Sequence, residues 1–279
     1  MVLDFIINPK KATGNPWEMY FIGALYSLFA VILSYWIFNT QASLVVVALT
    51  AMACVPFIHK AITSEENKDV VMKKFNEFKI LKEHYKLINV FVFLFLGFVT
   101  VFTVLYVVLP SSVIEKLFSS QIDTIIHIHT MATGKFYASF ETMGQIIFNN
   151  LKVMLFCLIF SFFYGVGAIF IITWNASVMG VALGSAIRHG ISLGTNIAQV
   201  ISINLVGYFV HGIPEIVAYF LVGLSGGILS AALHKEKFMS KKFKRVMLDS
   251  GSLFVLAIFI IILAAAIEVF ISPRLLFGF

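Results

Sequence analysis

The chain has 279 residues, of which 60% are hydrophobic and only 12% are charged, about half the charged fraction of an ordinary soluble domain. This composition excludes a disordered chain, a secreted disulfide scaffold and a nucleic-acid-binding domain, because so much apolar surface needs lipid as its solvent. The net charge of +6 therefore indicates membrane topology, and we expect no nucleic-acid partner. Cys54 and Cys157 both lie in apolar runs and are predicted to be small buried side chains rather than a disulfide.

Stretches without charged residues predict the membrane spans, because a Lys, Arg or Asp at the bilayer centre costs roughly 2.5 to 3.5 kcal/mol. The first stretch lies between Glu18 and Lys60, and the polar residues 39–41 divide it into a hairpin of two helices. On this basis the predicted spans are 17–38, 42–62, 87–109, 151–174, 213–233 and 250–272. The expected fold is an all-α, polytopic transmembrane bundle.

The segment 175–212 does not follow this pattern. Its apolar pieces, 176–187 and 197–210, are each shorter than the roughly 20 residues that a spanning helix needs. A polar linker with two glycines, 188–196, separates them. Two interpretations remain open, a broken or re-entrant helix that lines an enclosed cavity, or one tilted helix after an interfacial one.

The distribution of positive charge predicts the orientation. Residues 59–86 contain seven lysines, and residues 234–249 contain five lysines and one arginine, so both segments are expected in the cytoplasm. Residues 110–150 contain only Lys116 and Lys135 and are expected outside the cell. With the N-terminus cytoplasmic, segment 175–212 must make one net crossing. The prediction is about seven crossings in the cell membrane, with the C-terminus outside.

This topology divides the chain into three parts. They are an N-terminal hairpin (1–62), a lysine-rich cytoplasmic connector (63–86) and a five-crossing membrane domain (87–279) that includes the outer segment 110–150. Both aqueous segments have apolar residues at a helical period, so amphipathic interfacial helices are predicted within 70–85, 113–126 and 136–147. We favour helices that lie on the lipid surface over a dedicated docking groove.

Unusual polar residues concentrate between Asn149 and Gly227. In order they are Asn149-Asn150, Asn175-Ala176-Ser177 with Gly180, the run HGIPE from His211 to Glu215, and the run GLSGG from Gly223 to Gly227. Polar elements of this kind, in this order and at these intervals, resemble those of the stage II sporulation protein M family of integral membrane proteins. The resemblance covers roughly Leu87 to Phe279 and leaves out the N-terminal hairpin.

The resemblance implies a non-catalytic membrane scaffold. The protein that gives the family its name recruits peptidoglycan-degrading enzymes during engulfment in sporulating bacteria. From the residues alone we single out a polar cluster that is either structural or functional, made of Asn149, Asn150, Asn175, His211 and Glu215.

His211 and Glu215 are the strongest candidates for chemistry. Their spacing of four would place them on one helical face, which fits a proton relay or two ligands of a metal site. We favour another interpretation, in which Gly212 and Pro214 interrupt the helix and Glu215 lies in the first turn after the break. There the His211 ring or nearby amides such as those of Asn149 and Asn175 would pair with Glu215 and lock two spans together.

Two glycine pairs predict close helix packing. Gly180 and Gly184, and likewise Gly223 and Gly227, have the four-residue spacing that allows two helix backbones to approach. The spacing does not decide whether these contacts lie inside one chain or across a dimer.

The predicted function is a non-catalytic scaffold or assembly protein, expected to be a homodimer, that organises other membrane or surface proteins. We expect no cofactor and no resident metal. The alternative is a channel or secondary transporter with a site around Asn175, Asn204, His211 and Glu215. An enzyme is not expected, because two polar residues seldom make a complete active site.

Overall fold

The computed structural model describes residues 15–69, 77–133, 140–164 and 168–272, and every regular element in these ranges is a helix. This confirms the predicted all-α fold. Six helices within these ranges are long and apolar enough to cross a membrane, and one shorter apolar helix covers Ala42–Ile58. In chain order the helices are α3 (Glu18–Ile37), α4 (Ala42–Asp69), α5 (Glu77–Val108), α6 (Ser111–Thr133), α7 (Phe140–Tyr164), α8 (Ala168–Ser192), α9 (Ile197–Lys235) and α10 (Lys241–Phe270).

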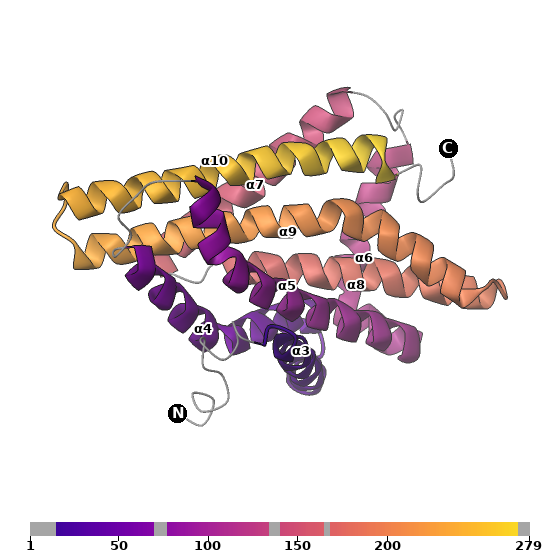
Figure 1. Ribbon diagram of the computed structural model, residues 1–279. Coiled ribbons are helices and arrows are strands. Elements are labelled where there is room, and N and C mark those ends of the chain that lie inside the picture. The colour runs from indigo at the N-terminus through magenta and orange to yellow at the C-terminus, as the bar shows by residue number, and fades with distance from the viewer. Residues whose placement is uncertain (1–14, 70–76, 134–139, 165–167, 273–279) are drawn as a thin grey trace.

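Helix α9 is the centre of the bundle and packs against α7, α8 and α10 (Figure 1). Every residue from Ala218 to Ile228 is buried, so neighbouring helices cover this part of α9 on all sides. Helix α7 approaches α9 closely at Gly226, where a Cβ atom would lie 2.8 Å from the carbonyl oxygen of Leu158. A larger residue at position 226 would therefore push α7 away from the core.

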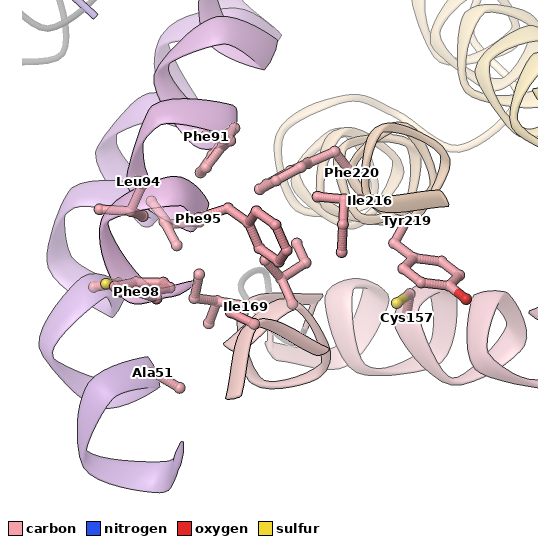
Figure 2. Close-up of a cluster of buried hydrophobic side chains, with 14 of the residues drawn as sticks. Ala51, Phe91, Leu94, Phe95, Phe98, Cys157, Ile169, Ile216, Tyr219 and Phe220 are labelled. Atoms are coloured by element: carbon pink, nitrogen blue, oxygen red, sulfur yellow. The ribbon is translucent and has the colours of Figure 1, made fainter. Parts of the chain in front are cut away.

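Aromatic and aliphatic side chains fill the space between α5 and α9 (Figure 2). The ring of Phe91 on α5 stacks on that of Phe220 on α9, with the centroids 4.0 Å apart and the planes 25° from parallel. Cys54 and Cys157 are both buried free thiols, which confirms the prediction made for them. Large side chains that interlock in this way give the bundle its packing without hydrogen bonds.

The helices alternate in direction, so that their connections gather at two ends. Figure 1 shows α5, α8 and α10 running one way and α7 and α9 running the other. The α9–α10 connection lies at one end of the bundle, and α6 lies across the other. The first of these ends carries the lysines and the arginine of residues 235–245.

The boundaries of the central spans differ from the prediction. The predicted span 151–174 is divided between α7, which ends at Tyr164, and α8, which begins at Ala168. The predicted re-entrant segment 175–212 is the second part of α8 and the first part of α9. Each of these helices is long enough to cross a membrane, so both interpretations of this segment were wrong. An absence of charge shows which residues suit lipid but not where the chain turns.

The predicted helix break between His211 and Glu215 was also wrong. Helix α9 is continuous for 39 residues with Pro214 inside it, and it bends along its length (Figure 1). Proline removes one backbone hydrogen bond, a loss that the neighbouring helices of a membrane bundle can accommodate. Gly212 lets α8 pack closely against α9 next to this proline. A Cβ atom at position 212 would lie 2.6 Å from the Cε atom of Met179 on α8.

Two of the three predicted amphipathic helices are parts of longer helices. The described part of connector 63–86 ends α4 and begins α5, while residues 70–76 lie outside the described ranges. Residues 140–147 form the first turns of α7, and residues 136–139 lie outside the described ranges. The predicted helix over residues 113–126 is confirmed as α6.

Glycines allow close contacts of α5 with α3 and α8. Figure 1 shows α3 nearly end-on and α5 from the side, so the two cross steeply, and at the crossing a Cβ atom on Gly23 would lie 2.5 Å from the carbonyl oxygen of Leu94. On α8, a Cβ atom at Gly180 would lie 2.7 Å from Phe102 Cβ, and one at Gly184 would lie 2.7 Å from Tyr106 Cβ. The pair at 180 and 184 thus serves a contact inside the chain, and Gly223 and Gly227 lie in the buried segment of α9.

Candidate functional site

The first candidate site is a chain of hydrogen bonds between α7 and α9, with Asn150 at its centre. The Asn150 amide nitrogen donates to Glu215 Oε1 at 2.8 Å, and the Tyr219 hydroxyl donates to Asn150 Oδ1 at 2.8 Å. Asn150 is 7% exposed and Tyr219 is 2% exposed. Both halves of the amide have partners, which fixes its orientation.

The continuity of α9 brings the members of this site together. His211, Glu215 and Tyr219 follow one another at intervals of four, so they lie on one face of the helix. Figure 2 shows Tyr219 reaching from α9 toward α7, with Cys157 beside its ring. A helix break at Pro214 would have turned His211 away from the other two residues.

Helix α10 closes the site from a third side. Ser272, just after the helix, has its hydroxyl 2.9 Å from His211 Nδ1, and the tautomer of the imidazole decides which atom donates. The carboxyl of Glu268 on α10 is near enough to that of Glu215 for the two to interact electrostatically. We call the following residues the acidic cluster: Asn150, His211, Glu215, Tyr219, Glu268 and Ser272.

This arrangement places two carboxyl groups inside the apolar part of the bundle. Asn150, Glu215 and Glu268 all belong to helices that are candidate membrane spans. Two ionised carboxylates repel each other strongly in a medium of low dielectric constant, so the site is suited to hold a proton or a small cation. Within the described ranges no group of three His, Cys, Asp or Glu side chains is placed to hold a metal ion.

The structure brings together three of the five residues that the sequence singled out. Asn150, His211 and Glu215 belong to the acidic cluster, but the partner of the His211 ring is Ser272, not Glu215. The side chain of Asn149 is exposed. Asn175 donates within its own helix to the carbonyl oxygen of Ile171 at 2.8 Å and takes no part in the cluster.

Sequence reasoning missed three members of the acidic cluster. Tyr219 could have been found from its spacing of four from Glu215, which puts both on one face. Glu268 is an isolated carboxyl residue in the apolar run of the last span, a feature that by itself marks a functional candidate. Ser272 has no such signal, because only the packing of α10 against α9 brings it to His211.

A second polar site joins α4, α6 and α8 and has no charged group. We call Ser43, Ser119, Ser120, Gln121 and Ser177 the hydroxyl cluster. Gln121 is fully buried, and its amide nitrogen lies 3.3 Å from the Ser43 carbonyl oxygen and 3.1 Å from Ser177 Oγ. The hydroxyls of Ser43 and Ser120 are 2.8 Å apart.

The hydroxyl cluster holds α6 across the end of the bundle. Leu117 and Phe118 are also buried, and the backbone of Phe118 is bent out of helical geometry, with φ −133° and ψ 17°. The opposite face of α6 leaves Glu115, Lys116 and Asp123 exposed. An amphipathic helix that only floated on lipid would not need a network of buried polar contacts to hold it in place.

Hydrogen bonds from Arg188 hold the end of α5 in place, just before the chain enters α6. Arg188 of α8 donates to the carbonyl oxygens of Tyr106 at 3.3 Å and Leu109 at 3.2 Å. These carbonyls at the end of α5 have no helical partners of their own, and a cation at this place also offsets the helix dipole. Pro110 directly precedes α6, and its carbonyl oxygen accepts from the amides of Val113 and Ile114, which fixes the corner between the two helices.

Comparison with known proteins identifies a family. The family model described as stage II sporulation protein M matches residues 90–273, which include both clusters except for Ser43. No curated protein and no solved structure matches the chain. The match begins after α3 and α4, which agrees with the extent of the resemblance seen in the motifs.

Proposed function

The chain belongs to the stage II sporulation protein M family of integral membrane proteins, and we propose that it is a non-catalytic scaffold that holds partner proteins at the membrane. We further propose that it acts as a homodimer in the cell membrane, with the N-terminus cytoplasmic and the C-terminus outside. The positive-inside rule supports this orientation, because the lysine-rich segments 59–86 and 234–249 then face the cytoplasm.

The observation that carries the scaffold proposal is the fixed position of α6. This helix is bound to α4 and α8 through the fully buried Gln121, while Glu115, Lys116 and Asp123 face outward. A rigid helix that presents mixed charges outside the hydrocarbon layer is a suitable surface for a protein partner, since little ordering entropy is lost on binding.

Photo-crosslinking in native membranes tests this proposal. A photoreactive amino acid at position 115, 116 or 123 should give adducts of defined mass with other proteins. The matched control is Phe259 on α10, which is 59% exposed on an apolar helix surface and should give lipid adducts only. Protein adducts at the α6 positions that do not exceed those at position 259 would exclude α6 as the docking surface.

A second candidate function is a channel or secondary transporter with its site at His211 and Glu215. The observation that favours it is the pair of carboxyls Glu215 and Glu268 between apolar helices. Ionisable residues at membrane depth commonly mark the path of a proton or an ion. Helix α9 is continuous, so this site is not built from two half-helices as it is in many secondary transporters. Flux into proteoliposomes, with the parent compared to Glu215→Gln, tests it.

A further inference from the structure

The α9–α10 connection is an ordered turn at the end of the bundle that carries the positive charge. The amide of Glu236 donates to the Ala232 carbonyl oxygen at 2.9 Å, and that of Ser240 donates to the Lys237 carbonyl oxygen at 3.0 Å. The Ser240 hydroxyl then accepts from the amide of Phe243 at 3.1 Å and caps α10. The cationic side chains of this turn are therefore attached to a defined backbone.

The charge of this turn is strongly one-sided. Residues 235–245 contain five lysines and one arginine but only one acidic residue, Glu236, which forms an ion pair with Lys242 at 3.7 Å. Four lysines with exposed side chains, together with the partly buried Arg245, surround the turn. We call these residues the basic collar, and they are Lys237, Lys241, Lys242, Lys244 and Arg245.

The basic collar lies close to the exposed apolar surface of α10, at a distance that fits the lipid headgroups. The exposed apolar surface of α10 begins at Met247 and Leu248, which are 45% and 60% exposed. Lys241 is six residues before Met247, or about 9 Å along the helix. The headgroup layer on each side of a bilayer is roughly 5 to 8 Å thick. The backbone of Lys241 thus lies just beyond a headgroup layer that begins at Met247, and a flexible lysine side chain can extend back to the level of the lipid phosphates.

An exposed aromatic side chain accompanies the charges. Phe238 is 73% exposed, and its ring lies 5.3 Å from that of the buried Phe243, so it is held beside the first turn of α10. Aromatic rings are enriched where headgroups meet hydrocarbon. A group of cationic residues beside an exposed apolar side chain is better suited to bind a lipid surface than to bind an acidic groove on a protein.

From this placement we infer that the basic collar binds the phosphate groups of anionic phospholipids in the leaflet that it faces. Under the expected orientation this is the cytoplasmic leaflet, whose anionic lipids attract basic residues next to a membrane helix. Several lysines at one level can contact several headgroups at once, so the lipids around α9 and α10 should be enriched in anionic species. The inference does not depend on the scaffold function.

Electron paramagnetic resonance with spin-labelled lipids tests the inference on the full chain in bilayers. The measured quantity is the ratio of the association constants of spin-labelled phosphatidylglycerol and phosphatidylcholine. The test variant is Lys241→Gln with Lys244→Gln. The matched control is Lys116→Gln with Lys152→Gln, which removes the same charge from exposed lysines on α6 and α7. Equal melting temperatures of all three proteins verify that the variants are folded.

We expect the parent to prefer phosphatidylglycerol. In the test variant the ratio of the two association constants should fall at least about fivefold, whereas in the control it should stay at the value of the parent. Raising the salt concentration should weaken the preference of the parent, because salt screens exposed charges. A parent without any preference would overturn the inference. An equal fall of the ratio in the two double variants would also overturn it. The same holds if the basic collar binds an acidic protein but the chain shows no preference among lipids.

Discussion

The acidic cluster and the hydroxyl cluster are both polar networks with a buried amide at the centre that join three helices, but they differ in their ionisable groups. The hydroxyl cluster consists of four serines and Gln121, which are all neutral, and it holds α6 on α4 and α8. The acidic cluster contains two carboxyls and an imidazole between α7, α9 and α10. Burying an ion costs several times more than burying a hydrogen-bonded neutral group. A structural contact between helices needs only neutral groups, so the acidic cluster contains more ionisable groups than packing requires.

The largest effect should come from giving the hydroxyl cluster a charge. In Gln121→Glu a carboxylate would replace an amide that is fully buried and that donates to the Ser43 carbonyl oxygen and the Ser177 hydroxyl. An uncompensated charge at such a site costs roughly 3 to 5 kcal/mol. We expect a loss of that size in the free energy of unfolding, measured by denaturant titration in detergent micelles.

A matched control lies on the same helix. Glu115→Gln makes the opposite exchange on the exposed face of α6 and should change the free energy of unfolding by less than about 0.5 kcal/mol. If Gln121→Glu were as mild as this control, the hydroxyl cluster would be open to water, and its role as a buried clamp of α6 would be wrong.

The second effect comes from removing the central carboxyl of the acidic cluster. Glu215→Ala leaves the Asn150 amide nitrogen without its acceptor, since that nitrogen donates to Glu215 Oε1 at 2.8 Å. A buried donor without a partner costs about 1 to 3 kcal/mol, so the melting temperature of the purified protein should fall. An unchanged melting temperature together with a loss of solute flux into proteoliposomes would show that Glu215 serves transport and not packing.

The sequence predicted the class of this fold well because lipid imposes a simple rule. A helix must satisfy its own backbone in hydrocarbon and must be apolar, so long stretches without charge identify the membrane helices. The same rule does not locate a turn inside apolar sequence. The end of α7 at Tyr164 and the start of α8 at Ala168 were missed for this reason. The turn between α8 and α9 does lie within the predicted polar linker 188–196, but the two full-length helices that it joins were not predicted.

The acidic cluster could be predicted only in part. His211 and Glu215 stand out because ionisable residues are rare in spans, and Asn150 stands out for similar reasons. Their partners are far along the chain, since Asn150 and Glu215 are 65 residues apart and His211 and Ser272 are 61 apart. Such pairs follow from how the helices pack, which a single sequence does not reveal. The hydroxyl cluster escaped notice because serines and a glutamine are ordinary residues near the end of a span.

A smaller loss is expected from Tyr219→Phe. This substitution removes the hydroxyl that donates to Asn150 Oδ1 at 2.8 Å and leaves the buried ring in place. A single neutral hydrogen bond contributes about 0.5 to 1.5 kcal/mol, so the free energy of unfolding should fall by that amount. Tyr85→Phe is the control, because Tyr85 is 59% exposed. Equal effects of the two substitutions would show that the hydrogen bond to Asn150 does not stabilise α7 against α9.

The smallest change in stability is expected from Glu215→Gln, which makes the acidic cluster more like the hydroxyl cluster. A glutamine keeps an oxygen that can accept from the Asn150 amide and nearly the same volume, so the contact between α7 and α9 persists. It also removes the repulsion from Glu268. These effects oppose the loss of a charge-assisted hydrogen bond, and we expect the free energy of unfolding to stay within about 1 kcal/mol of the parent.

Because the fold is retained, the variant Glu215→Gln separates the two candidate functions. A scaffold should keep the protein adducts at α6, whereas a transporter should lose solute flux in proteoliposomes. Loss of flux in a variant as stable as the parent would establish that the ionisable carboxyl of Glu215 serves transport, and the scaffold proposal would then be replaced by the transporter.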